Sequence, residues 1–343
     1  MRNSSDFKQF AEEDIRPTKF DDEHQRILLE DIGMLLSRQN EFVECKCPAC
    51  NMDDNEFQFS KRGFSYVQCK NCQTMYINPR PSKDVLKWFY RNSKNYEFWN
   101  NVIFPASEES RHKNIILPRV NKTIEICEKY NTQTNSLLEV GAGFGTYCAE
   151  IQSRNIFRRV VAIEPTPNLA LTCRKRNIET IELPIEEIEL SSDSLFDVIV
   201  NFEVIEHIFS PREFLSHVHR MLNQDGLLIL SCPNGKGFDV NTLKIKSDTV
   251  DHEHLNYFNP HSIGTLLNSC GFKLLEVFTP GRLDAELVRK KITSGEFNLE
   301  NDNDFLRQVL VDEWDRFGAS FQQFLVKNSF SSNMWAIAQK RPS

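Results

Sequence analysis

Apolar runs of strand length alternate with helical patterns over the second half of the chain. Each run is rich in Val, Ile, Leu or Phe, and most of the segments between them repeat apolar residues every three or four positions. This alternation is typical of a parallel sheet with helices on both faces. Ser210-Pro211-Arg212-Glu213 has the form of a helix capping box, and Asn259-Pro260 begins another helix. The runs lie at 137–140, 159–163, 196–202, 227–232, 272–278 and 334–338.

The first 135 residues follow a different pattern and divide into three segments. A weak apolar stripe predicts a helix within residues 1–40, and short alternating runs between paired cysteines predict a small β module at 41–80. Residues 81–135 form a helical linker in which Ser82 caps the first helix. Its aromatic side chains at 88–104 either pack the module onto the body or form a lid over a substrate. The remainder, 136–343, is then one domain with a helical insertion at about 281–331.

Three glycines at alternate positions follow the first of the apolar runs. Gly141, Gly143 and Gly145 stand between Glu139 and a helical pattern, which is the sequence form of a strand, a tight turn and a helix start. Glycine lets the backbone turn sharply and lets a ligand lie against it. A dinucleotide site needs G-x-G-x-x-G, but Thr146 occupies the place of the third glycine. The G-x-G-x-G form instead resembles the first motif of class I S-adenosylmethionine-dependent methyltransferases.

Glu164 ends the next apolar run, about twenty residues after the glycine turn, where such folds place a ribose-binding acid. A carboxylate accepts two hydrogen bonds and therefore suits a pair of ribose hydroxyls. The position is shared by nicotinamide and adenosylmethionine sites, so it predicts a nucleoside cofactor without separating the two.

Four cysteines form two C-x-x-C pairs whose spacing indicates a metal site. Cys47 and Cys50 make the first pair, and Cys69 and Cys72 follow after eighteen intervening residues. Two such turns bring four thiolates into a closed tetrahedral zinc site, which is structural because no coordination position stays open. The rival interpretation is a redox pair, although neither pair follows a strand and opens a helix. A module this small needs its metal to fold, so we expect chelation to unfold it before the rest.

The composition narrows the classes of function. The chain has 343 residues and a formal net charge of −7, with 40% hydrophobic and 26% charged residues, as in globular proteins. This charge, without a basic stripe, argues against nucleic acid as the main partner. No apolar run approaches the ~20 residues of a membrane span, and residues 1–30 lack the apolar core of a signal peptide. We therefore expect a cytoplasmic protein that acts on a small molecule.

Five motifs in register resemble class I S-adenosylmethionine-dependent methyltransferases from residue 136 to the end. The resemblance implies an α/β fold with a Rossmann-like seven-stranded sheet whose last strand runs antiparallel. The Glu-Val-Ile-Glu-His stretch at 203–207 is similar to ubiquinone-biosynthesis-type O-methyltransferases. The zinc knuckles, together with the stretch at 253–258, are similar to bacterial zinc-ribbon methyltransferases that resemble deoxysugar C-methyltransferases. The five motifs lie at 138–145, 164, 196–199, 202–207 and 233–234.

The same resemblance implies roles for the residues around the cofactor, S-adenosyl-L-methionine. The three glycines would admit the backbone to its methionine and ribose portions, Glu139 would orient its amino group, and Glu164 would hold its ribose. Ile185 would flank the adenine. Phe202 and Glu203 would line the cavity. An acceptor must then be aligned behind the sulfonium methyl group and lose its proton.

Two histidines are candidates for the base that removes this proton. His207 follows the fourth strand and His254 the fifth, so both lie at the ligand edge, and an imidazole pKa of about 6.5 suits neutral pH. The alternative for His207 is a local hydrogen bond that fixes its loop. The resemblance carries a Glu-His pair and the following Tyr onto Glu253, His254 and Tyr257. An extended segment would also put His252 and His254 on one face, which permits a second metal.

Three hypotheses of function follow from these patterns. The first is a methyltransferase acting on a sugar, a nucleotide-sugar or a similar glycan precursor, with O-methylation of a quinone-like or other small metabolite as the alternative. The second is a non-catalytic scaffold whose zinc ribbon recruits a partner. The third is a nicotinamide oxidoreductase, against which Thr146 and the Glu-Val-Ile-Glu-His stretch argue.

Overall fold

A seven-stranded sheet forms the centre of the computed structural model, which describes residues 12–15, 17–189, 195–299 and 303–341. Its strand order is β12-β13-β10-β9-β6-β7-β8, and β13 is antiparallel to both of its neighbours. The predicted sheet with an antiparallel last strand is therefore confirmed. The strands are β6 (Ser136–Val140), β7 (Arg159–Ile163), β8 (Glu179–Ile181), β9 (Phe196–Phe202), β10 (Leu222–Pro233), β12 (Phe272–Phe278) and β13 (Asn333–Lys340).

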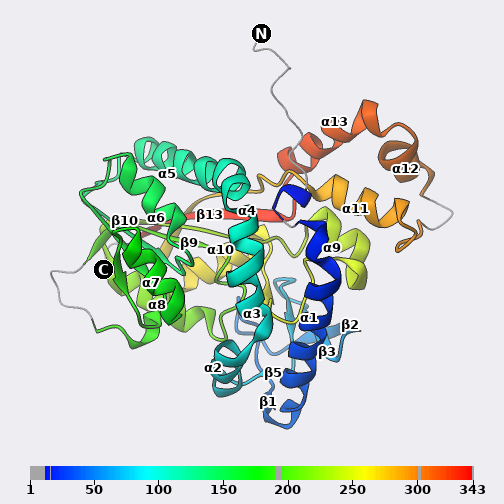
Figure 1. Cartoon of the computed structure of the whole chain (residues 1–343), viewed down its shortest axis with the longest axis horizontal. Coiled ribbons are helices and arrows are strands. Elements are labelled where there is room, and N and C mark those ends of the chain that lie inside the picture. The colour runs from blue at the N-terminus through cyan, green and yellow to red at the C-terminus, as the bar shows by residue number, and fades with distance from the viewer. Residues whose placement is uncertain (1–11, 16, 190–194, 300–302, 342–343) are drawn as a thin grey trace.

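Helices cover both faces of this sheet, which is why its central strands are apolar throughout. Leu137 and Val198 face one helical layer, whereas the next residues, Leu138 and Ile199, face the other, because side chains alternate along a strand. Figure 1 shows the helices wrapped around the sheet. One layer contains α5 (Leu117–Lys129), α6 (Thr146–Ser153) and α7 (Pro167–Lys175), and the other α8 (Pro211–Met221) and α10 (Pro260–Ser269).

The linker that precedes the sheet is a nearly continuous helical rod. It consists of α3 (Lys94–Phe98), α4 (Phe104–Arg111) and α5, joined by π-helical turns at 99–103 and 112–116. Each π-helical turn ends two residues before a proline, Pro105 or Pro118. Proline lacks an amide hydrogen and clashes with the carbonyl group four residues earlier, which accounts for the widened turns.

The start of α8 differs from the capping box that its sequence predicts. Among the described residues, Ser210 makes no side-chain bond to the helix, and Glu213 pairs with Lys83 of α2 (Lys83–Asn92) instead. An ammonium group attracts a carboxylate more strongly than a neutral amide does. Two other predicted starts are confirmed, because Ser82 caps α2 and Asn259 makes a capping box with Ser262 in α10.

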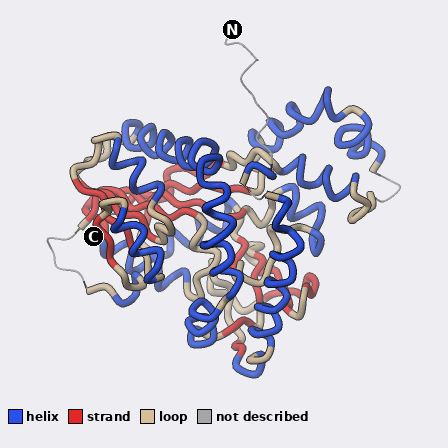
Figure 2. Tube along the Cα trace, in the orientation of Figure 1, coloured by secondary structure: helices blue, strands red, loops and turns tan. Residues whose placement is uncertain are grey.

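A second, four-stranded antiparallel sheet lies beside the paired cysteines, of which Cys69 ends β3, and a distant part of the chain completes it. Its order is β11-β4-β3-β2, and β11 comes from the connection after β10. Figure 2 shows these strands apart from the large sheet. α1 (Asp21–Leu36) packs Leu28, Ile32 and Leu35 against this module. Its strands are β2 (Asn55–Lys61), β3 (Phe64–Cys69), β4 (Met75–Ile77) and β11 (Asn256–Tyr257), beside the short pair β1 (Phe42–Val43) and β5 (Arg80–Pro81).

The predicted helical insertion lies between β12 and β13 and has an apolar cluster of its own. Leu243, in α9 (Phe238–Leu243), packs there with Val288, Leu310 and Leu325. Figure 1 shows the insertion projecting from the body at the upper right. Trp314, Phe317 and Phe321 pack against this cluster and are partly buried, so the insertion forms a small helical layer. The helices are α11 (Asp284–Thr293), α12 (Asp304–Arg307) and α13 (Trp314–Lys327).

Helix lengths also bear on whether the chain crosses a membrane. α1 has 16 residues and α13 has 14. Within the described ranges, no helix is long and apolar enough to cross a bilayer.

Candidate functional site

The strand order marks one edge of the sheet as the place for a ligand. Connections leave in opposite directions from β6 and β9, so a crevice opens beyond the carboxyl ends of these neighbouring strands. The glycine turn follows β6, Glu164 follows β7, and the segment from Glu203 to His207 follows β9. Three segments that the sequence marks separately therefore meet at one edge.

The glycine turn requires glycine for its conformation and for its space. Gly141, Gly143 and Gly145 have φ angles of +79°, +55° and +68°, which residues with a side chain rarely adopt. A Cβ atom on Gly141 would stand 2.5 Å from Cγ2 of Val204. The loop after β9 therefore lies directly against the turn, and the two form one wall of the crevice.

Two buried carboxyl groups flank the glycine turn. Glu164 accepts hydrogen bonds from the amides of Gly143 at 2.8 Å and Thr166 at 2.9 Å, and burial raises its pKa. Glu139 accepts from the Cys148 thiol at 3.0 Å, and burial raises its pKa to about 8. A cation beside either carboxyl would favour its ionised form. A carboxyl group that ionises beside a cation suits Glu139, which is predicted to bind the ammonium group of the cofactor.

Phe202 and Glu203 lie at the end of β9, beside an arginine that sequence reasoning missed. Oε1 of Glu203 accepts from the Ser231 hydroxyl, from the Asn333 amide at 3.1 Å and from the Arg119 guanidinium at 3.4 Å. The same guanidinium lies 4.9 Å from the centre of the Phe202 ring. Arg119 belongs to α5, where nothing in the spacing of the sequence marks it.

Ile185 lies in a short 3-10 helix, Ile185–Glu187, and is 3% exposed. It belongs to the same apolar cluster as Leu138 and Ile163, below the crevice. This placement supplies apolar surface beside the ends of β6 and β7. The contact with an adenine ring remains a prediction.

The two candidate histidines meet at the end of the loop after β9. Ligand-capable atoms of Glu206, His207 and His254 lie within 4.8 Å of one another. Nδ1 of His207 is 3.0 Å from the carbonyl oxygen of Glu253, and Nδ1 of His254 is 2.9 Å from that of Thr249. A carbonyl oxygen only accepts, so each Nδ1 carries a hydrogen, and in the neutral ring Nε2 keeps its lone pair.

We call this group the Glu206 cluster (Glu206, His207 and His254), and burial sets the protonation of its first two members. Burial lowers the pKa of His207 to about 3, so its imidazole is neutral near pH 7. Burial also raises the pKa of Glu206 well above its ordinary value. Glu206 is not among the catalytic residues that the sequence predicts. Its signal was present as the second acid of the Glu-Val-Ile-Glu-His stretch.

Glu253 and Tyr257, the other members of the predicted catalytic set, lie in the same part of the chain, and the Tyr257 ring is 5.9 Å from the ring of His254. Their roles in catalysis remain predictions. The Glu253 carboxyl accepts from the Asn95 side-chain amide of α3 at 2.9 Å, and burial raises its pKa to about 8. The Tyr257 hydroxyl donates to the Asp251 carbonyl at 3.1 Å and accepts from the Asp251 amide at 2.9 Å. Both side chains therefore hold the loop that carries His254.

His252 does not share a face with His254. Its ring packs against Phe64 and Phe89, with 5.9 Å between ring centres in each case. The extended conformation considered for this segment is not adopted, because Oδ1 of Asp251 accepts from the second and third amides after it and bends the chain.

The aromatic side chains of the linker divide between the two roles left open by the sequence. Phe89 packs with Phe64 of the cysteine module. At the other end, the Phe104 ring lies 5.0 Å from the ring of Phe144 in the glycine turn, and the Arg111 guanidinium lies 4.5 Å from Phe104. The linker thus packs the module at α2 and covers the glycine turn at α4.

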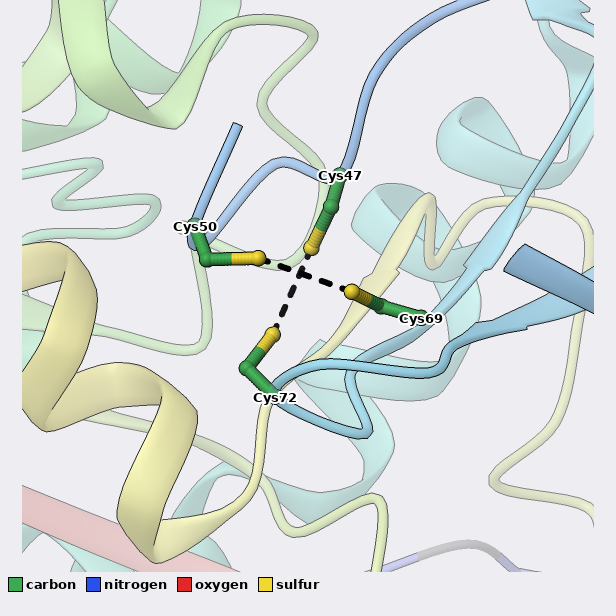
Figure 3. A group of neighbouring side chains, drawn as sticks. All are labelled: Cys47, Cys50, Cys69 and Cys72. Atoms are coloured by element: carbon green, nitrogen blue, oxygen red, sulfur yellow. Dashed lines mark hydrogen bonds between the residues drawn. The ribbon is translucent and has the colours of Figure 1, made fainter. Parts of the chain in front are cut away.

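The four paired cysteines converge from two turns, and Figure 3 shows their thiols pointing toward one another. Sγ of Cys47 lies 3.5 Å from Sγ of Cys72, and Sγ of Cys50 lies 3.5 Å from Sγ of Cys69. Sulfurs bound tetrahedrally to zinc at about 2.3 Å would stand about 3.8 Å apart. The observed spacing therefore fits a zinc ion at their centre.

Comparison with protein families gives a match that includes the crevice. Residues 111–277 match a family described as a methyltransferase domain. The matched segment spans the glycine turn, Glu164, the loop after β9 and His254. The predicted resemblance to S-adenosylmethionine-dependent methyltransferases is thereby confirmed for this domain.

Individual relatives extend the comparison. The chain is 28% identical to C-methyltransferase NovU of Streptomyces niveus over 62% of its own length and 47% of the relative. It is 29% identical to the ubiquinone biosynthesis O-methyltransferase of Rickettsia akari over 32% of its length and 45% of the relative. The chain thus spans about half the length of these curated relatives.

One solved structure covers more of the chain at lower similarity. An S-adenosylmethionine-dependent methyltransferase from Clostridium acetobutylicum is 10% identical, with a TM-score of 0.45, over 73% of this chain and 98% of that one. The strand order of the sheet identifies the fold independently of this likeness.

Proposed function

We propose that this chain, which carries a class I S-adenosylmethionine-dependent methyltransferase domain, transfers the cofactor's methyl group to a small-molecule acceptor. The acceptor that we propose is a sugar, a nucleotide-sugar or another glycan precursor. The observation that carries the proposal is that the glycine turn, Glu164 and the Glu206 cluster meet at one edge of the sheet. A cofactor in the crevice would then stand beside groups that can accept a proton.

Each part of the crevice has a task in this reaction. Glu164 would bind the ribose, and Glu139 would bind the amino group of the cofactor. The acceptor would enter from the side of the Glu206 cluster, where the Nε2 lone pair of His254 can take its proton. Burial lowers the pKa of His207 to about 3, so this ring is a weak base and would mainly orient the acceptor. The transfer is an in-line displacement, so holding cofactor and acceptor on one line supplies much of the acceleration.

Two features support a sugar-type acceptor. The similarity to a C-methyltransferase covers 62% of this chain, whereas that to a ubiquinone O-methyltransferase covers 32%. The zinc knuckles and the stretch at 253–258 also resemble zinc-ribbon methyltransferases of the deoxysugar type. The alternative, O-methylation of a quinone-like metabolite, is supported by the Glu-Val-Ile-Glu-His stretch.

We also propose that Cys47, Cys50, Cys69 and Cys72 hold a structural zinc ion. Four thiolates leave no position open for a substrate. The ion would fix the strands of the module, and β4 of that module pairs with β11, which begins two residues after His254. Zinc would therefore support the reacting edge from a distance.

Calorimetric titration of the zinc-loaded chain with S-adenosylhomocysteine tests the cofactor. We expect micromolar binding that is lost in Glu164→Ala, because the ribose loses its carboxylate acceptor. Glu179→Ala is the matched control, since that exposed glutamate at the start of β8 only pairs with Arg159 on the surface. No binding by the folded chain would overturn the proposed function.

A panel of acceptors tests the substrate class. Production of S-adenosylhomocysteine should appear with nucleotide-linked deoxysugars and not with catechols or quinols. His254→Ala should lower turnover by about 100-fold or more, in the range of a lost general base. Because the acceptor would lose a positioning contact, His207→Ala should also lower turnover. His261→Ala, an exposed histidine in α10, should leave it unchanged. Turnover with quinols alone would favour the alternative.

A further inference from the structure

Glu206 is a buried carboxyl group without a binding partner. Its side chain is 0% exposed, and neither carboxyl oxygen has a hydrogen-bond partner among the residues that the structure describes. Buried acids are normally hydrogen-bonded, paired with a cation or bound to a metal, because burying an unpaired charge is strongly unfavourable. The methyl transfer proposed above assigns this carboxyl no task. Its environment therefore points to a partner from outside the chain.

Two imidazole nitrogens with free lone pairs belong to the same group. His207 and His254 donate from Nδ1 to backbone carbonyls, and Oδ2 of Asp251 lies 3.3 Å from Nδ1 of His254 as a further acceptor. Metal-binding histidines typically have such an oxygen on the nitrogen that does not bind the metal, because it fixes the ring and its tautomer. Both rings are thus prepared to act as ligands through Nε2.

We propose that Glu206, His207 and His254 bind a divalent transition-metal ion. Atoms that bind one ion at about 2.0–2.2 Å lie at most about 4.4 Å apart, and the three ligand-capable atoms here lie within 4.8 Å of one another. Small side-chain rotations would therefore close the site. Two imidazoles and a carboxylate suit Mn²⁺, Fe²⁺, Co²⁺ or Zn²⁺ and leave positions open for water or substrate.

The position of the site indicates what such an ion would do. Val204, in the same loop, lies against Gly141 of the glycine turn, so the ion would stand beside the cofactor crevice. A hydroxyl or carbonyl oxygen of the acceptor could bind at an open position, where the cation would lower the pKa of the acceptor. The ion would then take the place of the histidine base proposed above, because a nitrogen that binds a metal has no lone pair left for a proton. This last step rests on the proposed function, whereas binding of the ion does not.

Binding of Mn²⁺ to the zinc-loaded chain tests the proposal directly. Mn²⁺ prefers oxygen and nitrogen ligands to thiolates, so the four cysteines do not compete for it. Electron paramagnetic resonance of free Mn²⁺ at increasing concentration gives the stoichiometry and the affinity. We expect one Mn²⁺ per chain, and binding weakened at least about 100-fold in Glu206→Gln because a charged ligand is lost. His261→Ala should bind Mn²⁺ as the unchanged chain does.

Titration with S-adenosylhomocysteine and near-ultraviolet circular dichroism separate a lost ligand from a lost fold. Weak Mn²⁺ binding in a Glu206→Gln chain that still binds the cofactor product would establish the site. If that variant does not fold, His254→Gln, at a partly exposed ligand, must weaken binding to the same extent. Unchanged affinity in these variants, or no binding to the unchanged chain, would overturn the proposal. Mn²⁺ binding without cofactor binding would instead refute the proposed function alone.

Discussion

At the scale of single residues, the crevice depends on carboxyl groups whose protonation is set by burial. Glu139, Glu164 and Glu206 all have raised pKa values, and desolvation is the main cause for each. Their partners differ, because Glu139 has a thiol, Glu164 has two backbone amides, and Glu206 has none among the described residues. The three glutamates therefore suit three different proposed partners: the ammonium group of the cofactor, its ribose, and a metal ion.

Glu139 should lose a proton when the cofactor binds. With a pKa of about 8, the free carboxyl is largely protonated at about pH 7, and a bound ammonium group favours the ionised form. S-adenosylhomocysteine binding should therefore release nearly one proton at about pH 7, and its affinity should rise from about pH 6 to pH 8. Calorimetry in buffers of different ionisation enthalpy measures the release. Glu139→Gln must abolish it, and an undiminished release in that variant would contradict the assignment.

Gly141 should tolerate a methyl group less well than Gly143. Both have positive φ, which costs an alanine about 1–2 kcal/mol, but only a Cβ on Gly141 meets Val204 at 2.5 Å. We expect Gly141→Ala to lower the free energy of unfolding by about 2–4 kcal/mol and Gly143→Ala by about 1 kcal/mol. Urea unfolding of the cofactor-free chain measures both. Equal losses would mean that Val204 moves aside without cost.

At the scale of elements, one buried arginine joins the cysteine module to the loops of the large domain. Arg80 of β5 is 1% exposed. Its guanidinium donates to the Phe209 carbonyl at 3.2 Å, to the Asn256 side-chain oxygen at 3.1 Å and to the Leu255 carbonyl at 3.4 Å. These acceptors belong to the loop after β9 and to β11 with the residue before it. Arg80 therefore holds together the two segments that carry His207 and His254.

Replacing Arg80 by lysine should loosen this junction. Lysine keeps the charge but cannot reach several acceptors from one planar group, so buried carbonyls would lose their donors. We expect a loss of about 2–4 kcal/mol in the free energy of unfolding. Arg91→Lys, at an exposed position in α2, should change it by less than about 0.5 kcal/mol. Urea unfolding compares the two, and similar values for both would show that the junction does not depend on Arg80.

At the scale of the whole molecule, the cysteine module and the domain of the large sheet share a core. Cys47, Cys69 and Cys72 belong to the same apolar cluster as Leu138 of β6 and Phe214 of α8. β11 also belongs to the module's sheet, although it comes from the domain. The module is therefore not connected to the rest by a linker alone, which changes what loss of zinc should do.

Loss of the proposed zinc should reach the edge of the crevice. We expect Cys69→Ser to raise amide exchange at least about tenfold in β3 and β4 and also in β11, while β6 and β9 stay protected. Cys270→Ser is the control, because Cys270 is a partly exposed cysteine that is not one of the four paired cysteines. Hydrogen-exchange mass spectrometry resolves these segments. If β11 kept its protection while β3 lost it, the module would unfold by itself, as the sequence alone suggests.

The sequence by itself determined the features that depend on local spacing. A few neighbouring residues are enough to recognise the strand runs, the three glycines, Glu164 and the two C-x-x-C pairs. Backbone geometry and metal coordination constrain residues that are close together in the sequence. The matched methyltransferase domain and the antiparallel β13 confirm the fold that these patterns predict. The capping box predicted at Ser210 does not form, because Lys83, more than a hundred residues earlier in the chain, pairs with Glu213.

Only the tertiary structure decided which distant residues act together. His207 and His254 are 47 positions apart, and they meet because β11 joins the cysteine module and its preceding loop turns at Asp251. Burial then set the protonation of Glu206 and His207, which no local pattern reports. Contacts across the fold and removal from water depend on the whole packed chain, so the Glu206 cluster could be recognised only after the chain was folded.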